Sequence, residues 1–556
     1  MQAVSVPRTR VIPPRPALAL SIRWPLGEAA TVFWAAFFGY VAIAGILVFV
    51  DNVIFRDALS RVASAQRILY SRDPHLAAIG FVWGPLPSLV LLPLVPLKVV
   101  WPALTQLGFA GNLVSALCMA GAVREFLLAL GGLQLRRSAR LVLTVLFATH
   151  PIVLLFAANG MSEAMLLFCL LAATRHLLRW FRAGELEAAV LAALALGAGC
   201  LVRYEAAIAA LAAGLLIAGV SVWRASGTWR ARLWAGQADI LIVAAPSLAA
   251  FSFWFVVSWL ITGHPIEQFA SQYGNSSQLQ ATGVTAVSAA AHAGWLAVTI
   301  QQAIEIEPVA LTLALAGLAV GAWRRDVAPL VIGATLGSVL LFMLALDAKG
   351  MVSHELRYMI VEIPLAGLMA GVLMQPGALR LPRGTSFALL PAAAALLLLP
   401  GFPSSIHALL DPQLDPIDGA QLRSMVSRSS VDEERAAARF VTERRIAGDL
   451  DQSQLAAGSV LIDDFLGFPV VVSSRNPRQF VITSDRDFTA ALSDPAGVGV
   501  QYVLVPQPTG LGLLDAVNRQ YPDLYGTGIG LGPLVREYIN SGDGMTWRLY
   551  WVTPPR

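Results

Sequence analysis

Long apolar stretches alternate with short polar loops between residues 30 and 402. A bilayer core is crossed by about 20 apolar residues in helical form, so this pattern predicts about eleven membrane-spanning helices. The expected spans cover residues 30–50, 105–127, 141–158, 163–180, 187–202, 206–223, 238–262, 305–323, 327–347, 359–376 and 385–402. The pattern is therefore typical of a polytopic α-helical membrane protein.

The polar stretch after the first expected span has a helical pattern of its own. Its apolar side comprises Leu59, Val62, Ala65 and Leu69, and its polar side comprises Ser60, Arg61, Ser64 and Arg67. This spacing predicts an amphipathic helix over 57–70 at the membrane surface. The apolar run 82–103 that follows is interrupted by prolines, which favours a broken or re-entrant segment over a complete span.

The composition changes after residue 402, where charged and amide side chains return. Short runs typical of strands occur at 459–463, 469–473, 480–483, 501–505 and 547–552. Helices are expected near 431–447 and 511–521, which together predict a soluble α/β domain of about 150 residues. The chain thus divides into an N-terminal tail (1–29), a membrane domain (30–402) whose first outer loop covers 51–104, and the α/β domain (403–556).

Charge sets the expected orientation. Only 13% of the 556 residues are charged, about half of what a soluble domain carries, and the net charge is +4. Arginines gather in alternate short loops, near residues 136–140, 175–182, 224–232, 324–325 and 380–383. The positive-inside rule places these loops and the N-terminus in the cytoplasm and, with an odd number of spans, the C-terminal domain outside. This arginine distribution indicates membrane orientation and does not form a nucleic-acid-binding patch.

Polar side chains far apart in the sequence converge on the outer face in this topology. They are Asp51, Asp57, His75, Asn159, Glu163, Arg203, Gln272, Tyr273, Asn275, Lys349, Arg357 and Tyr358. A one-sided cluster of ionisable groups in a membrane protein points to a functional site. The three cysteines lie in apolar segments, and the histidines and acids lack the spacing of a zinc site.

Several short motifs resemble those of one enzyme family. Asp57 opens the run DALSRVASAQRIL, the segment FVWGPLP follows at 81–87, and NGMSE lies at 159–163. Arg357 and Tyr358 open a late span. The chain resembles GT-C glycosyltransferases, the broad group that includes protein O-mannosyltransferases and lipid A aminoarabinose transferases.

The resemblance implies a GT-C arrangement of the spans in the cytoplasmic (inner) membrane of a bacterium. It implies a polyprenyl-phosphate-linked sugar as donor and a glycan, glycolipid or protein as acceptor. Many relatives carry two adjacent acids in the first loop, whereas here Ala58 follows Asp57 and Asn52 follows Asp51. The choice of base and any dependence on a divalent cation therefore stay open.

The chemistry of glycosyl transfer assigns roles to these residues. A carboxylate must take the proton of the acceptor hydroxyl, and cations must stabilise the departing phosphate. Asp57 is the leading base and Asp51 the second, and one carboxylate without a second acting as nucleophile favours inversion. Arg203, Lys349 and Arg357 are expected at the donor phosphate. The expected substrate-binding residues are Glu163, Asn159, Gln272, Tyr273, Asn275, Tyr358 and His75.

Some of these residues could instead have a purely structural role. Asp57 and Arg61 are four residues apart and would also suit an exposed helical ion pair. Arg203 with Glu205, and Arg357 with Glu355, would suit pairs at helix ends. The competing functions are a multi-pass transporter or lipid flippase and a non-catalytic envelope-assembly subunit. The sequence shows no repeated halves, which argues against a transporter.

Overall fold

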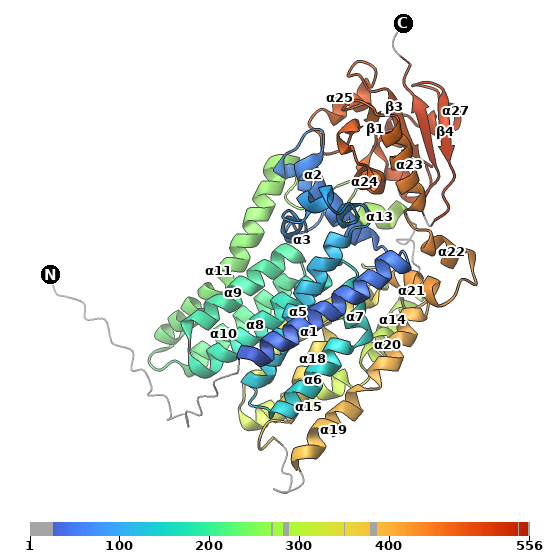
Figure 1. Ribbon diagram of the computed structural model, residues 1–556. Coiled ribbons are helices and arrows are strands. Elements are labelled where there is room, and N and C mark those ends of the chain that lie inside the picture. The colour runs from blue at the N-terminus through green and yellow to red at the C-terminus, as the bar shows by residue number, and fades with distance from the viewer. Residues whose placement is uncertain are drawn as a thin grey trace, which may run out of the picture.

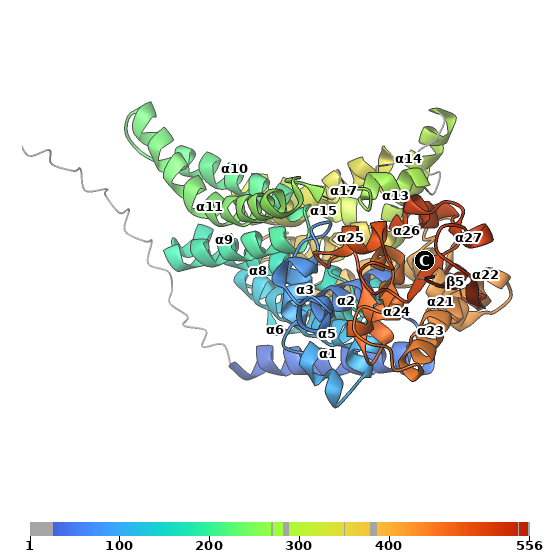
Figure 2. The ribbon, with the colours of Figure 1, turned by 90° about the horizontal axis from the view of Figure 1, so that it is seen from above.

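The computed structural model describes residues 26–267, 271–281, 289–349, 351–378, 386–542 and 544–553. Figure 1 shows a bundle of long helices that carries the C-terminal domain at one end, next to the short helices α2 and α3. Figure 2, which views the molecule from that end, shows the domain over α2 and α5 and leaves α9 to α11 beside it. The first outer loop therefore lies between the bundle and the domain.

The bundle contains the predicted spans. The long apolar helices are α1 (Leu26–Gly45, continued by η1, Ile46–Val50), α5 (Phe109–Gly132), α8 (Glu163–Ala183), α10 (Ala206–Arg224), α11 (Trp229–Thr262), α16 to α17 (Ala328–Ile332 and Ser338–Ala348), η5 to α18 (Leu356–Met359 and Glu362–Leu373) and α19 to α20 (Ser386–Leu398 and Gly401–Leu410). Eight helices of the described chain are long and apolar enough to cross a membrane. Counting two bent pairs as one span each raises the number to ten.

Two bent helix pairs and one shorter helix account for the remaining predicted spans. The pairs are α6 with α7 (Arg137–Thr149 and Pro151–Ala158, bent by 61°) and α14 with α15 (Ala289–Ile306 and Ala310–Arg324, bent by 74°). The 17-residue helix α9 (Leu186–Val202) occupies the remaining predicted span. Large apolar side chains such as Phe38 and Leu260 are 63% and 72% exposed on outward faces, which a bilayer would cover. The prediction of a multi-pass membrane protein is confirmed.

The first outer loop folds largely as its pattern predicts. Helix α2 (Arg56–Tyr70) buries Leu59, Val62 and Ala65. Leu69, which the pattern placed on the same side, is 38% exposed instead, because the apolar stripe of α2 shifts to Ile68 at its end. The proline-rich run breaks into three short pieces: α3 (Leu86–Leu91), η3 (Val95–Val99) and α4 (Ala103–Gln106). This confirms that 82–103 is a broken segment.

The C-terminal domain is built on a five-stranded sheet with the order β2-β1-β3-β5-β4. The strands are β1 (Val460–Leu461), β2 (Phe480–Val481), β3 (Tyr502–Pro506), β4 (Leu534–Tyr538) and β5 (Trp547–Trp551). The first three run parallel, and β5 pairs antiparallel with both β3 and β4. Its helices include α21 (Asp418–Val426), α22 (Val431–Ala437), α23 (Val441–Gln452), α25 (Phe488–Ser493) and α26 (Ala516–Gln520).

The predicted strand at 469–473 is wrong. These residues form the second half of helix α24 (Asp464–Ser473), which begins where the Asp463 carboxylate accepts a hydrogen bond from the Phe465 amide at 2.9 Å. That N-terminal cap outweighs the strand propensity of the valines at 470–472. The edge strand β4 was not predicted, because its side chains are mostly exposed and give no apolar alternation.

Asn52 fastens the C-terminal domain to the membrane bundle. It has a positive φ of 52°, which an asparagine tolerates better than most residues. Its amide donates to the carbonyl oxygens of Ala437 and Arg439 at 2.9 and 3.2 Å, and its side-chain oxygen accepts from Arg444 at 2.8 Å. These bonds tie the end of the first span to helices α22 and α23.

The topology predicts which surface positions a membrane-impermeant maleimide reaches. Ala183→Cys lies exposed after an arginine-bearing helix end, and Ser493→Cys lies exposed in the C-terminal domain. We expect Ser493→Cys to be labelled in intact spheroplasts and Ala183→Cys to be labelled only after permeabilisation. The unmodified chain is the control for its three native cysteines: Cys169 and Cys200 are buried, and the partly buried Cys118 lies within the apolar helix α5. The opposite labelling pattern would contradict this orientation.

Candidate active site

A cavity of about 460 Å³ lies between the membrane bundle and the C-terminal domain. Its bundle side is the polar face of α2, from Asp57 to Arg67, together with the segment 77–84. Its other side is formed by Tyr273, by Gln278 of α13 (Asn275–Ala281), and by Phe465 and Phe468 of α24. A cavity of this size is typical of a small-molecule site.

Asp57 lies where the cavity meets a buried polar network. Its carboxylate accepts a hydrogen bond from Arg357 at 3.1 Å and is 35% exposed, whereas the Arg357 side chain is 11% exposed. Enclosure favours the neutral acid, but the charges of Arg357 and Arg61 outweigh it and hold the pKa of Asp57 below its usual range. Asp57 therefore presents an ionised carboxylate to the cavity at neutral pH.

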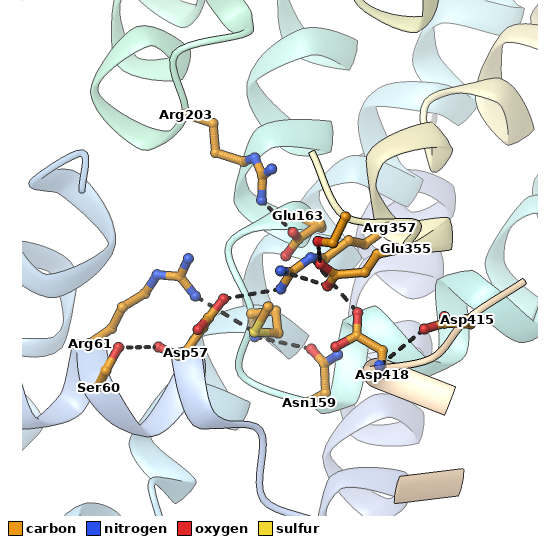
Figure 3. Close-up of polar contacts among 12 residues, drawn as sticks. Asp57, Ser60, Arg61, Asn159, Glu163, Arg203, Glu355, Arg357, Asp415 and Asp418 are labelled. Atoms are coloured by element: carbon orange, nitrogen blue, oxygen red, sulfur yellow. Dashed lines mark hydrogen bonds and ion pairs between the residues drawn. The ribbon is translucent and has the colours of Figure 1, made fainter. Parts of the chain in front are cut away.

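Further acids surround Arg357. Its guanidinium lies 2.6 Å from Glu355 and 3.8 Å from Asp418, and Asp415 accepts the backbone amide of Asp418 at 3.0 Å (Figure 3). Burial raises the pKa of Glu355, Asp415 and Asp418 above the ordinary carboxyl range. Sequence reasoning missed Asp415 and Asp418, because they follow the last span in a stretch that carries no motif.

Arg203 forms a second ion-paired centre on the same side of the site. Its guanidinium pairs with Glu163 (Figure 3) and also with Glu205. The Tyr358 ring lies 5.7 Å from the Arg203 guanidinium and 5.3 Å from that of Arg357, so the tyrosine lies within cation–π range of both arginines. Asp57, Arg203 and Arg357 thus lie near one another (Figure 3), but neither arginine lines the cavity and both already pair with carboxylates.

Gly160 holds the NGMSE motif against α2. It has a φ of 79°, and an added Cβ would lie 3.0 Å from the Ala58 Cβ and 3.2 Å from the Asn112 nitrogen. Its neighbour Asn159 accepts the Met161 amide at 3.0 Å and shapes the same turn. The turn therefore sets the separation between Asp57, next to Ala58, and Glu163 at the start of α8.

Two other expected residues line the cavity. His75 contributes to its wall and contacts the Asp73 carbonyl oxygen through Nδ1 at 2.7 Å. Tyr273 donates a hydrogen bond to Asp463 at 2.9 Å and packs on Phe465, with ring centroids 5.0 Å apart. Both residues thus lie within reach of a bound molecule.

The remaining expected residues lie elsewhere. Asp51 ends η1 and is not part of the cavity wall, Lys349 is exposed at the end of α17, and Gln272 is exposed. The side chain of Asn275 is outside the described residues. Only Asp57 of the two acids considered as base therefore faces the cavity.

The C-terminal domain supplies wall residues that sequence reasoning did not identify. Asp464 pairs with Arg67 and also accepts a hydrogen bond from Thr483. Ser484 and Phe468 line the same wall. Asp463 and Asp464 lie at the end of the predicted strand 459–463; their position over α2 depends on how the domain packs, which the sequence does not reveal.

The site was also tested for a divalent cation. In the part of the chain that the structure describes, no group of three His, Cys, Asp or Glu side chains is arranged to hold a metal ion. The acids nearest Asp57 converge on the Arg357 guanidinium instead. The described residues do not fit a bound cation.

Comparison with solved structures identifies the fold. ArnT from Cupriavidus metallidurans bound to undecaprenyl phosphate matches 93% of this chain and 98% of its own, with a TM-score of 0.51 and 13% identity. The Archaeoglobus fulgidus oligosaccharyltransferase in the apo form matches 87% of this chain and 70% of its own (TM-score 0.44, 10% identity). No protein-family model and no curated protein sequence matches the chain. The chain has the GT-C fold.

The Gly160 turn predicts a specific loss of stability. Gly160→Ala places a Cβ against Ala58 at a positive φ, which should cost about 1–3 kcal/mol. Gly184→Ala is the matched control, because Gly184 has a φ of 68° but nothing lies within 4 Å of its Cβ position. We expect thermal unfolding in detergent to begin at a lower temperature for Gly160→Ala than for Gly184→Ala. Equal unfolding temperatures would show that the contact with α2 is not tight.

Proposed function

We propose that the protein is an inverting glycosyltransferase that moves a sugar from a polyprenyl-phosphate donor to an acceptor outside the bacterial cytoplasmic membrane. The observation that carries this proposal is Asp57, an ionised carboxylate that faces a large polar cavity at the end of the membrane bundle. The fold supports it, because the ArnT structure that shares this fold holds undecaprenyl phosphate.

The reaction is a single displacement at the anomeric carbon. The acceptor oxygen forms the new bond while its proton passes to Asp57, and the bond between the anomeric carbon and the phosphate oxygen breaks with its electron pair on that oxygen. The products are the glycoside and the polyprenyl phosphate. Because a single carboxylate acts as base and no glycosyl-enzyme forms, the sugar inverts.

Arg357 prepares Asp57 for this role. Its hydrogen bond fixes the carboxylate, and its charge keeps the carboxylate ionised. Glu355 and Asp418 in turn hold Arg357, since carboxylate partners offset the cost of burying its guanidinium charge. The geometry of the base is therefore set before any substrate arrives, which lowers the cost of reaching the transition state.

The rest of the cavity suits a sugar. Ser60 and Ser64 of α2 face Thr483 and Ser484 of the C-terminal domain, and Phe468 provides an apolar surface. Hydroxyl side chains can bind the hydroxyl groups of a hexose or a pentose, and an aromatic ring can pack against a sugar face. His75, Tyr273 and Gln278 add further hydrogen-bonding groups to the wall of the cavity.

Loss of the base carboxylate tests the proposal. Asp57→Asn keeps the size of the side chain but cannot take a proton, so the rate of transfer should fall by about 100-fold or more. Asp51→Asn is the matched control, because Asp51 is not part of the cavity wall. The measurement is the glycan content of the cell envelope in a deletion strain that carries either variant. Full restoration by Asp57→Asn would exclude it as the base.

The pH dependence of transfer tests the role of Arg357. Asp57 acts as base only when ionised, so activity is lost as the pH falls through its pKa, which Arg357 and Arg61 lower. Arg357→Gln removes the hydrogen-bonded charge, raises that pKa and moves the acidic limb of the pH–rate profile to higher pH. The control is Arg324→Gln, because Arg324 is hydrogen-bonded to Gln375 and does not contact Asp57 or Arg357. An unshifted acidic limb in Arg357→Gln would contradict this assignment.

A further inference from the structure

Arg61 is the unusual cation of the site. Its guanidinium lies in the cavity wall, and the hydrogen bond that it makes among the described residues goes to the Met161 sulfur at 3.7 Å. It forms no ion pair with any carboxylate of the described chain. A thioether is a weak acceptor, so five strong N–H donors of a charged group are left largely without strong protein partners.

The other cations near Asp57 differ in this respect. Arg357 pairs with Asp57 and Glu355, and Arg203 pairs with Glu163 and Glu205. Arg67, on the same face of α2 as Arg61, pairs with Asp464. Each of these three arginines thus pairs with at least one carboxylate, whereas Arg61 pairs with none in the described chain.

The surroundings of Arg61 show that this charge is costly. Burial lowers the pKa of Arg61 below the usual arginine value, and the more distant charges of Asp57 and Glu163 offset this only in part. An enclosed guanidinium without a bonded anion is stabilised when an anion binds beside it. Figure 3 shows the Arg61 guanidinium next to the Asp57 carboxylate, which lies between it and Arg357.

We infer that Arg61 binds the phosphate of the polyprenyl-phosphate lipid, in place of Arg203, Lys349 or Arg357. This inference rests on the proposed function and assigns the leaving-group side of that reaction. As the bond between the anomeric carbon and the phosphate oxygen breaks, negative charge grows on the phosphate, and the planar guanidinium can donate two hydrogen bonds to it. The acceptor's proton goes to Asp57, so one turn of α2 carries both the base and the phosphate ligand.

Binding of the product lipid to the full-length protein in nanodiscs tests the inference. The probes are undecaprenyl phosphate and undecaprenol, which differ in the phosphate group. A charge-assisted contact predicts that wild type prefers the phosphate by about 10- to 100-fold and that Arg61→Gln loses this preference. Arg61→Lys keeps the charge but not the two-pronged geometry, so it should retain part of the preference.

The matched control is Arg536→Gln, which removes an arginine that pairs with Asp449 outside the cavity wall and changes the net charge by the same amount as Arg61→Gln. This change should leave the phosphate preference intact. Thermal unfolding of each variant shows that the protein is folded. A wild-type protein without phosphate preference, or an unchanged preference in Arg61→Gln, would overturn the inference.

The binding test of Arg61 and the activity test of Asp57 can fail independently of each other. If Asp57→Asn abolishes transfer while Arg61→Gln keeps the phosphate preference, the reaction stands and the phosphate ligand is another residue. If Arg61→Gln loses the preference while Asp57→Asn still transfers sugar, the lipid site stands and the base is another residue.

Discussion

The ion pair between Asp57 and Arg357 is the contact on which the site depends. It joins the first outer loop to the start of a late span, across 300 residues of sequence. Water hydrates a buried guanidinium poorly, so Arg357 requires anionic partners, and the chain provides Glu355 and Asp418 in addition to Asp57. The carboxylate that faces the cavity is thus the exposed end of a network that the bundle and the segment after its last helix build together.

This network gives α2 two packing partners. One face of α2 buries Leu59 and Val62 in the membrane bundle, while Arg67 pairs with Asp464 of the C-terminal domain. The position of Asp57 therefore depends on both contacts, and so does the shape of the cavity between them. If Asp57 is the base, as proposed, a change that loosens the domain should lower the rate of transfer even where it lies far from the reacting atoms, because positioning errors of about 1 Å are costly.

Much of the membrane architecture follows from local sequence signals. Length and apolarity determine the spans, helical spacing determines α2, and prolines determine the break at 82–103. Two features did not follow from these signals. The strand propensity of the valines at 470–472 was outweighed by the Asp463 cap, and Asp418 lies in a stretch without a motif and joins the network only through tertiary packing. The clustering of Asp57, Arg203 and Arg357 could be predicted from topology, but the unpaired state of Arg61 could not, because it depends on which carboxylates the other arginines take.

The two sides of the cavity contribute different kinds of side chain. The bundle side contributes the fixed charges of Asp57 and Arg61, and Arg357 supports Asp57 from behind the cavity wall. The domain side contributes hydroxyl and aromatic groups, such as Thr483 and Phe468, which distinguish shapes and hydrogen-bonding patterns more than charges. In the proposed reaction, charge develops at the phosphate and at the acceptor oxygen whatever sugar is transferred, so the proposal assigns these steps to the bundle side. The same proposal assigns the selection of sugar and acceptor to the domain side, where substitutions leave the charges of the bundle side unchanged.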